Sequence, residues 1–188
     1  MKIVLASASP RRKELLQQLG IEFEICVSDV DEKISETMPA RMVEELSSRK
    51  AEAVFRQIKG DVLVIGADTV VAIGEQILGK PENEAHAKDM LKSLQAREHH
   101  VYTGVTIYKR QNGKEFRSVF SESTLVKFFP MTDAEIQWYV SSKEPMDKAG
   151  AYGIQGLGAR YIERISGDYN NVVGLPIARL YQELKYYY

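Results

Sequence analysis

Two long runs of alternating apolar and polar residues constrain the fold of this chain more than any other feature. The first run is HVYTGVTIYKR at 100–110, the second is EFRSVFSESTLVKFF at 115–129, and Asn112-Gly113 lies between them. Alternation with a period of two predicts half-buried strands, and Asn-Gly between two such runs is the strongest short-range signal for a β-hairpin. We therefore expect a pair of long antiparallel strands to form the spine of a sheet.

The segments around this hairpin alternate between helical and strand patterns. Apolar runs predict strands at 2–6, 22–28, 62–67 and 159–165, and a short hairpin at 69–78 that turns at Gly74 and Glu75. Helical spacing and capping residues predict helices at 9–19, 41–57, 84–94 and 177–188, and one that begins after Thr132 with a Thr132 to Glu135 capping box. Glycine-rich loops are expected at 147–158 and 166–176. This mixture predicts one α/β unit, with two lobes around a cleft as its internal arrangement.

Composition limits the partners of such a domain. The 188 residues carry 25 basic and 26 acidic side chains, so the net charge of -1 gives no global attraction to nucleic acid or to an anionic membrane. No stretch approaches the roughly 20 apolar residues of a membrane span, and the apolar run near the N-terminus is too short for a signal peptide. The single cysteine, Cys26, excludes an internal disulfide. We expect a single cytoplasmic domain over 1–188, in which any anion site is local.

The segment LASASPRRKELL at 5–16 is the first candidate for such a local site. It predicts a strand, a tight loop and a helix with Ser9 as N-cap and Pro10 in the first turn. Arg11 and Arg12 then lie at the positive end of the helix dipole, where an anion would relieve the repulsion. Free backbone N–H groups, the hydroxyls of Ser7 and Ser9 and the two guanidinium groups all suit phosphate oxygens. The alternative is a capped helix whose arginines only face water.

Asp68 is the second candidate, because it follows the apolar strand VLVIGA at the point where we expect the chain to leave the sheet. Binding groups in open α/β sheets collect at the carboxyl ends of strands. A carboxylate there holds a divalent metal or accepts a proton from water, unless it only caps a turn. The adjacent Thr69 favours the functional interpretation.

Other charged side chains are weaker candidates when each is taken alone. Lys80 in ILGKP and Lys50 in the helix at 41–57 are either phosphate contacts or solvated surface charges. The acidic connection SDVDEK offers Asp29, Asp31 and Glu32 as metal ligands or as a solvated acidic run. The histidines have no spacing typical of a metal site.

Six blocks together resemble one family. They are LASASPRRKELL, GADTVV, LGKP, TGV, DKAGAYGIQG and NNVVGLP, and they extend in this order from Leu5 to about Leu184. The chain is similar to the Maf family of nucleoside triphosphate pyrophosphatases. The resemblance implies an elongated α/β fold with a central cleft, similar to inosine triphosphate pyrophosphatases. It also implies hydrolysis of nucleoside triphosphates to monophosphate and pyrophosphate with Mg²⁺ or Mn²⁺.

The resemblance assigns roles to particular positions of this sequence. Asp68 matches the family's proton acceptor, and Glu32 matches an acidic residue implicated, with Asp68, in metal binding. The positions that match the lining of the triphosphate cleft are Ser7, Arg12, Lys50 and Lys80. The positions that match specificity residues of the branch preferring dTTP and UTP are Arg11, Thr69 and Gln155. The amide of Gln155 is suited to the O4 or N3–H edge of a pyrimidine.

Three questions stay open at this level. The same phosphate-binding residues would serve a nucleotide-binding regulator of septum formation and cell-division arrest, and the preferred substrate of an enzyme would be either a canonical or a modified pyrimidine nucleotide. A homodimer is suggested by the family alone. One departure from the family concerns a turn, because Gln95-Ala96 stands where a Ser-Gly pair is common.

Overall fold

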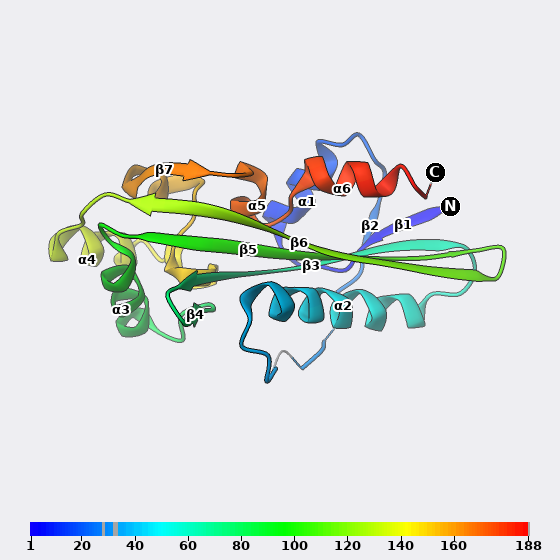
Figure 1. Cartoon of the computed structure of the whole chain (residues 1–188), viewed down its shortest axis with the longest axis horizontal. Coiled ribbons are helices and arrows are strands. Elements are labelled where there is room, and N and C mark those ends of the chain that lie inside the picture. The colour runs from blue at the N-terminus through cyan, green and yellow to red at the C-terminus, as the bar shows by residue number, and fades with distance from the viewer. Residues whose placement is uncertain (28, 32–33, 188) are drawn as a thin grey trace. The chain divides into compact units, whose positions relative to one another are not determined.

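The structure, a computed structural model, describes residues 1–27, 29–31 and 34–187 (Figure 1). Its strands are β1 Lys2–Leu5, β2 Glu24–Ile25, β3 Val62–Ile73, β4 Gln76–Leu78, β5 Glu98–Gln111, β6 Lys114–Phe128 and β7 Ile162–Ser166. Its α-helices are α1 Pro10–Gln17, α2 Pro39–Gln57, α3 Glu84–Leu94, α4 Asp133–Ser141, α5 Tyr169–Val173 and α6 Ile177–Leu184. Three 3₁₀ helices are η1 Glu144–Asp147, η2 Ala149–Ala151 and η3 Gly156–Tyr161.

The strands form one mixed sheet in the order β2-β1-β3-β5-β6-β7, with β4 paired to β3. β1 runs parallel to both β2 and β3, whereas β4 is antiparallel to β3 and β7 is antiparallel to β6. The predicted α/β class with a mixed sheet and flanking helices is therefore confirmed. Among the described residues, none of the helices has the length and hydropathy that a membrane span requires.

The β5-β6 hairpin confirms the expectation drawn from the two alternating runs. Asn112 and Gly113 connect the strands with φ angles of 50° and 76°. Both values lie in the left-handed region that a two-residue type I′ turn requires, which is why Asn and Gly are favoured there. The Asn112 N–H also donates to the Asp61 carboxylate over 3.0 Å, which ties the turn to the chain just before β3.

The chain forms two compact units. Unit 1 consists of Met1–Asp68, Thr103–Glu122 and Gly174–Tyr188, and unit 2 of Thr69–Tyr102 and Ser123–Val173. β3, β5 and β6 each contribute residues to both units. The single domain expected over 1–188, and the cleft expected between its lobes, stay predictions.

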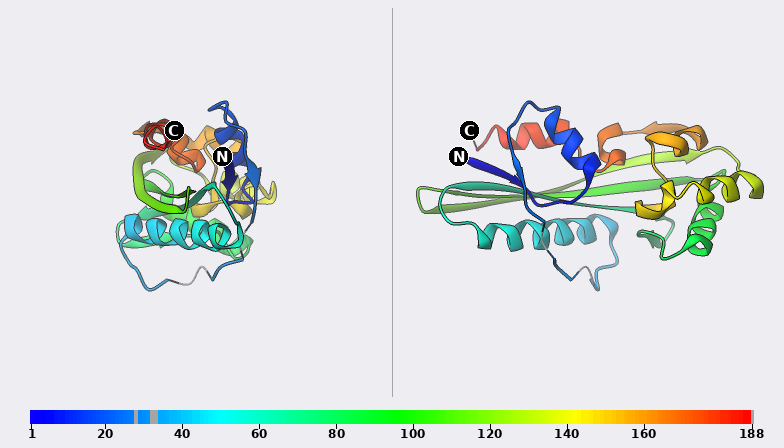
Figure 2. Two further views of the ribbon diagram at one scale, coloured as in Figure 1. Left: turned by 90° about the vertical axis from the view of Figure 1, so that its right-hand side faces the viewer. Right: turned by 180° about the vertical axis from the view of Figure 1, so that it is seen from behind.

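Unit 1 is organised by the long helix α2. Figures 1 and 2 show α2 along one face of the unit 1 strands, with α1 and α6 on the other side. A Cβ atom on Gly66 would lie 2.5 Å from the Ser47 carbonyl oxygen, and one on Gly104 would lie 2.3 Å from the Val43 carbonyl group. Because no side chain fits at these two positions, the backbone of α2 lies directly against the backbones of β3 and β5.

Unit 2 has its own core, in which α3 packs against α4 and η2. One buried polar contact of this core joins His99 Nε2 and the Tyr152 hydroxyl over 2.7 Å. Both rings also pack edge-on against Phe128. Burial, together with the neighbouring His100, lowers the pKa of His99 to about 4, so the imidazole is neutral at pH 7. Around His99 the core of unit 2 is therefore held by packing and a neutral hydrogen bond.

Helix ends follow the expected capping residues. Ser9 Oγ accepts a hydrogen bond from the Arg12 N–H over 3.4 Å, Pro10 opens α1, and Gly20 ends the segment with a φ of 67°. At α4, Thr132 and Glu135 form the complete capping box. The hydrogen bonds from the Thr132 N–H and hydroxyl lower the pKa of Glu135, as expected for a carboxylate that accepts two bonds at a helix N-terminus.

The structure differs from the expected elements in several places. In the strand expected at 159–165, residues 159–161 belong to η3 and only 162–165 to β7, and the helix expected at 177–188 ends at Leu184. The strand expected at 22–28 reduces to β2, whose two residues are both exposed. The strand expected at 62–67 continues through Asp68 to Ile73, so the chain does not leave the sheet at Asp68. The β-branched run that follows Asp68 continues the strand and pairs with β4. In the loop expected at 166–176, five residues form the short helix α5.

At Gln95-Ala96, where a Ser-Gly pair is common in the family, the chain forms a turn that places Ala96 in the left-handed region. Ala96 has a φ of 55°, and its N–H donates to the Phe129 carbonyl over 3.1 Å. Gln95 Oε1 accepts a 3.4 Å hydrogen bond from the Met131 N–H. A glycine adopts such a φ without a Cβ clash, so alanine holds this turn at a small conformational cost.

We expect Gly104→Ala to destabilise the protein, because its Cβ would overlap the Val43 carbonyl group and force α2 away from β5. Overpacking of this kind costs about 1–3 kcal/mol of unfolding free energy. Urea unfolding followed by circular dichroism measures it. Gly79→Ala is the matched control, since a Cβ there meets nothing within 4 Å, and equal midpoints for the two variants would contradict the close contact.

Candidate functional site

The site in unit 1 is built on the face of β3 that α2 covers. Alternation along β3 places Val64, Gly66 and Asp68 on one face, and Val64 packs in the apolar cluster that contains Ala51 of α2. Because Gly66 lets α2 approach closely, Lys50, one residue before Ala51, reaches the carboxylate two residues further along β3. The sequence thus brings an ammonium and a carboxylate together at the end of an apolar face.

Lys50 and Asp68 form a nearly buried ion pair. Lys50 Nζ donates to Asp68 Oδ1 over 2.6 Å, and the two side chains are only 15% and 12% exposed. Within the described part of the chain, no hydrogen bond reaches the second carboxylate oxygen, Asp68 Oδ2. One oxygen is therefore held in place, and the other is left to act on a ligand.

The loop between β1 and α1 forms a second polar group. Ser7 is buried, and its Oγ accepts hydrogen bonds from the Ser9 N–H over 3.2 Å and from Arg12 Nη1 over 3.3 Å. Arg12 Nε donates to the Gly174 carbonyl over 2.8 Å, which fixes the guanidinium against the segment before α6. A serine hydroxyl has two acceptor positions and one donor, and both acceptor positions of Ser7 are used. Its hydrogen is thus left to donate, as an anion site needs.

Strand register places this loop beside Asp68. Leu5 pairs with Ile65 in the parallel β1-β3 ladder, and the Ala6 N–H extends the ladder to the Ile65 carbonyl over 2.8 Å. Ser7 follows two residues after Leu5, so it lies level with Ala67 on the neighbouring strand, one residue before Asp68. The structure therefore brings together two of the predicted groups, the phosphate-type loop and the carboxylate with its lysine.

The remaining predicted residues are placed as follows. Arg11 is half-buried in the first turn of α1, and Thr69 follows Asp68 on the opposite face of β3. Lys80 is exposed after β4, and Gln155 is exposed directly before η3. Glu32, the predicted second metal ligand, lies outside the described residues. Of its neighbours, Asp31 is exposed and its carbonyl accepts a hydrogen bond from Arg49 Nη1 over 3.2 Å.

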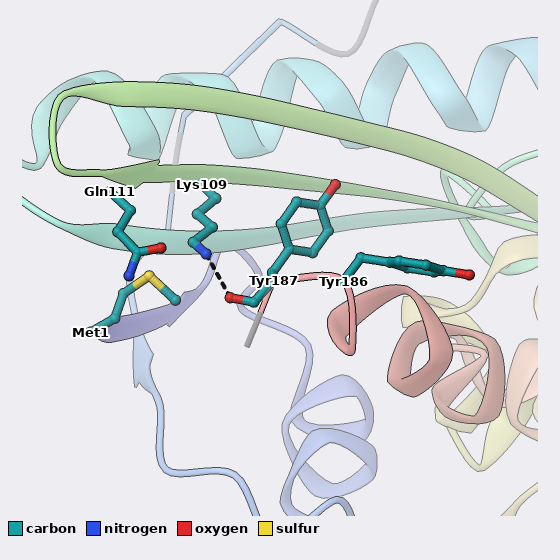
Figure 3. Close-up of a pocket in the computed structure, with 5 residues that line it drawn as sticks. All are labelled: Met1, Lys109, Gln111, Tyr186 and Tyr187. Atoms are coloured by element: carbon teal, nitrogen blue, oxygen red, sulfur yellow. Dashed lines mark hydrogen bonds between the residues drawn. The ribbon is translucent and has the colours of Figure 1, made fainter.

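A cavity of about 360 Å³ in unit 1 lies apart from these residues (Figure 3). It is lined by Met1, Lys109, Gln111, Tyr186 and Tyr187. Lys109 Nζ donates to the Tyr187 carbonyl over 2.6 Å, so the ammonium ties the C-terminal segment to β5. Met1 precedes β1 whereas Ser7 follows it, so the cavity and the Ser7 loop lie at opposite ends of that strand.

Reasoning from the sequence missed the glycines that position this site. Gly66 and Gly104 interrupt the β-branched runs VLVIGADTVV and VYTGVTIY, and a glycine inside a strand pattern signals a close approach of another backbone. It also missed Glu144, whose carboxylate accepts hydrogen bonds from the backbone of Leu157 and Gly158. No local pattern around Glu144 identifies these partners, because they lie more than ten residues away in the chain.

Comparison with known proteins decides the family. The family described as Maf-like protein matches residues 2–187. This chain belongs to the Maf family. The match includes both units, and it confirms the resemblance carried by the six sequence blocks.

Curated relatives of this Maf protein are similar over almost the whole chain. The dTTP/UTP pyrophosphatase of Lachnoclostridium phytofermentans is 54% identical over 185 residues, which is 98% of this chain and 94% of its own. The proteins with the same name from Agathobacter rectalis and Carboxydothermus hydrogenoformans are 51% and 52% identical, over 98% of this chain and 96% and 98% of theirs. A solved structure, that of the Staphylococcus aureus Ham1 protein, aligns over 86% of this chain and 80% of its own, with 16% identity and a TM-score of 0.48. That structural likeness is too weak to carry an argument.

We expect Lys50→Met to lower the unfolding free energy by about 3 kcal/mol, because it leaves the Asp68 carboxylate buried without its cation. Adding Asp68→Asn removes the unpaired charge, so the double variant should regain much of that loss. Urea unfolding of the four proteins in the cycle measures the coupling. Lys59→Met, at an exposed lysine, is the control. If the stability losses of Lys50→Met and Asp68→Asn simply added in the double variant, the result would contradict a stabilising ion pair.

Proposed function

We propose that this Maf protein is a nucleoside triphosphate pyrophosphatase that hydrolyses dTTP and UTP to the monophosphate and pyrophosphate. The observation that carries the proposal is the nearly buried Asp68 carboxylate, held by Lys50 and level with the Ser7 loop. A general base needs a defined carboxylate within reach of the substrate, and a triphosphate needs donors and cations beside it. The names of the relatives at 51–54% identity support the same activity.

The β1-α1 loop is proposed to bind the triphosphate. The N-terminus of α1 carries no acidic residue in its first turn, so its backbone N–H groups and dipole favour an anion. Arg11 and Arg12 supply planar donors that match phosphate oxygens, and the Ser7 hydroxyl has a hydrogen left to donate. We propose the same kind of phosphate contact for Ser9, because its hydroxyl lies at the N-terminus of α1, and for Lys80, because the family resemblance implies a position in the triphosphate cleft.

The proposed reaction uses Asp68 as the proton acceptor. A water oxygen attacks the α-phosphorus while one of its protons passes to Asp68 Oδ2. The bond between the α-phosphorus and the oxygen that bridges to the β-phosphorus breaks, and pyrophosphate leaves with that oxygen. Lys50 keeps the carboxylate oriented through Oδ1, and Arg12 stabilises charge that grows on the phosphate oxygens.

A divalent metal, Mg²⁺ or Mn²⁺, is part of this proposal. Asp68 offers the hard oxygen that these ions prefer, and Mg²⁺ is often held by one or two carboxylates with substrate phosphates and water completing its shell. Among the described residues, no group of three or more His, Cys, Asp or Glu side chains forms a metal cage. The donor set thus fits an ion that arrives with the nucleotide, with Glu32 as the proposed second ligand. Such an ion polarises phosphate oxygens and lowers the pKa of bound water.

Pyrophosphate release from a panel of nucleotides tests the proposed function. The panel contains dTTP, UTP, CTP, GTP, ATP and modified pyrimidine triphosphates, each with Mg²⁺, Mn²⁺ or a chelator. We expect metal-dependent release that is fastest with dTTP, UTP or their modified relatives. Tight nucleotide binding without release would instead support a nucleotide-binding regulator, and a purine preference would overturn the proposed substrate class.

Asp68→Asn tests the role of the carboxylate. We expect kcat to fall by about 10²–10⁴-fold, the usual contribution of general base catalysis, while the urea midpoint shows that the protein is folded. Asp89→Asn, at an exposed position of α3, should keep full activity. Near-normal turnover in folded Asp68→Asn protein would remove Asp68 from the mechanism.

A further inference from the structure

The carboxylate of Glu144 organises a backbone loop in unit 2. Glu144 Oε2 accepts a hydrogen bond from the Leu157 N–H over 2.8 Å, and Oε1 accepts one from the Gly158 N–H over 3.0 Å. The Tyr139 hydroxyl donates to Oε1 over 2.9 Å. Three donors from two separate segments therefore converge on one side chain, which is typical of a carboxylate that determines local structure.

Tyr139 holds the other end of the same loop. Its side chain is fully buried in the core of unit 2, and its hydroxyl oxygen accepts a hydrogen bond from the Gly153 N–H over 3.2 Å. Gly153 is thus fixed through Tyr139, and Leu157 and Gly158 are fixed through Glu144. The segment 153–158 is held at both ends by one connected pair of side chains.

Glycines allow the loop to lie this close to its two supports. Gly156 has a φ of 77°, and a Cβ there would lie 2.6 Å from Glu144 Oε2. A Cβ on Gly158 would lie 2.5 Å from the Tyr139 hydroxyl oxygen. The glycines of this segment therefore allow contact with the Glu144–Tyr139 pair that a larger residue would block.

Gln155 lies in the middle of this fixed segment. It directly precedes η3 in the N-cap position, yet its side chain makes no capping hydrogen bond. Glu144 accepts the N–H groups of Leu157 and Gly158 that a capping side chain would otherwise take. The exposed side chain of Gln155 therefore does not cap η3, although capping is the usual role of a side chain at the N-cap position.

Glu144 is ionised at neutral pH. Burial raises its pKa, but the hydrogen bonds from Leu157, Gly158 and Tyr139 outweigh that effect and the pKa is lowered. An ionised carboxylate accepts all three bonds at once, whereas a protonated one would turn one oxygen into a donor.

We propose that Glu144 is a positioning residue for nucleotide selection: its carboxylate fixes the backbone of 153–158, so that Gln155 presents its amide to the base edge of the nucleotide. This inference rests on the proposed dTTP and UTP hydrolysis and on the specificity role that the family resemblance implies for Gln155. A glycine-rich loop left unsupported would lose its conformational freedom when the nucleotide binds, and this entropy cost would weaken binding. Because Glu144 orders the segment when the protein folds, this entropy is already lost before the nucleotide binds. A fixed amide also rejects a base with the wrong donor and acceptor pattern more strongly than a mobile one.

The test compares Glu144→Gln with the matched control Glu84→Gln. The first substitution replaces one acceptor oxygen by an NH₂ group that faces a backbone N–H, whereas Glu84 is an exposed carboxylate that pairs with Lys143, next to Glu144 in the chain. We expect Glu144→Gln to raise KM for UTP and dTTP about tenfold, the equivalent of one hydrogen bond to a charged group, with kcat within about twofold. Since CTP differs from UTP at this base edge, the preference for UTP over CTP in kcat/KM should also fall about tenfold. Glu84→Gln should leave both values unchanged.

Tyr139→Phe keeps the carboxylate and removes only the hydroxyl, so it tests the support even if Glu144→Gln does not fold. We expect a smaller loss of the UTP preference. Hydrogen exchange of the peptide that contains 153–158 supplies a readout independent of activity, and exchange should be about tenfold faster in Glu144→Gln, in which one of the two backbone hydrogen bonds is lost. Unchanged exchange, or faster exchange with unchanged KM and UTP preference, would overturn the inference.

Failure of the proposed function has a different signature. If the unmodified protein releases no pyrophosphate, calorimetric binding of α,β-imido analogues of UTP and CTP measures the same preference without turnover. A preference that is lost in Glu144→Gln would support the positioning role although the hydrolase proposal had failed. Equal binding of the two analogues by the unmodified protein would overturn the positioning role itself.

Discussion

The direct contact between α2 and the two central strands of unit 1 is the constraint on which the site depends. Gly66 and Gly104 remove the side chains that would otherwise separate the helix from β3 and β5. A lysine on a helix at an ordinary distance from the sheet would extend its ammonium into water, because this is the least costly position for a charge. With the helix pressed against the strands, Lys50 instead ends at Asp68.

A role in the proposed reaction explains the Lys50–Asp68 pair better than a contribution to the free energy of folding does. Desolvating two charges costs several kcal/mol per ion, and apolar residues of similar volume often serve stability as well or better. The other β3 positions on this face carry Val62, Val64, Gly66, Val70 and Ala72, so an apolar residue would continue the pattern at position 68. Charges at such a place are typical of sites where a carboxylate must have one orientation and little competing water.

The sequence predicted correctly those turns, caps and helices that are determined by residues close to one another in the chain. The Asn112-Gly113 turn, the Ser9 and Thr132 caps and the spacing of apolar residues in α2 each depend on neighbours within a few residues, and the structure confirms them. The end of β3 was predicted wrongly because strand continuation past Asp68 depends on pairing with β4. The Glu144 contacts were missed for the same reason, since they join residues thirteen and fourteen positions apart. For the candidate site, the sequence indicated Ser7, Arg12, Lys50 and Asp68 as candidates. It could not predict their mutual contacts, which depend on strand register and on two glycines.

Both units hold one side chain or loop in a fixed position through a neighbouring charged side chain. In each, a residue with a proposed role at the nucleotide is held in place by another residue. In unit 1 a lysine orients one carboxylate oxygen of Asp68 and leaves the other available, and in unit 2 Glu144 takes over the capping bonds that Gln155 would otherwise make. In both cases glycines admit the supporting group at a distance that a Cβ would forbid. Preorganisation of this kind transfers the entropy cost of ordering from ligand binding to folding, where the packing of each core offsets it. The supporting residues are therefore expected to influence nucleotide affinity and selection without contacting the nucleotide.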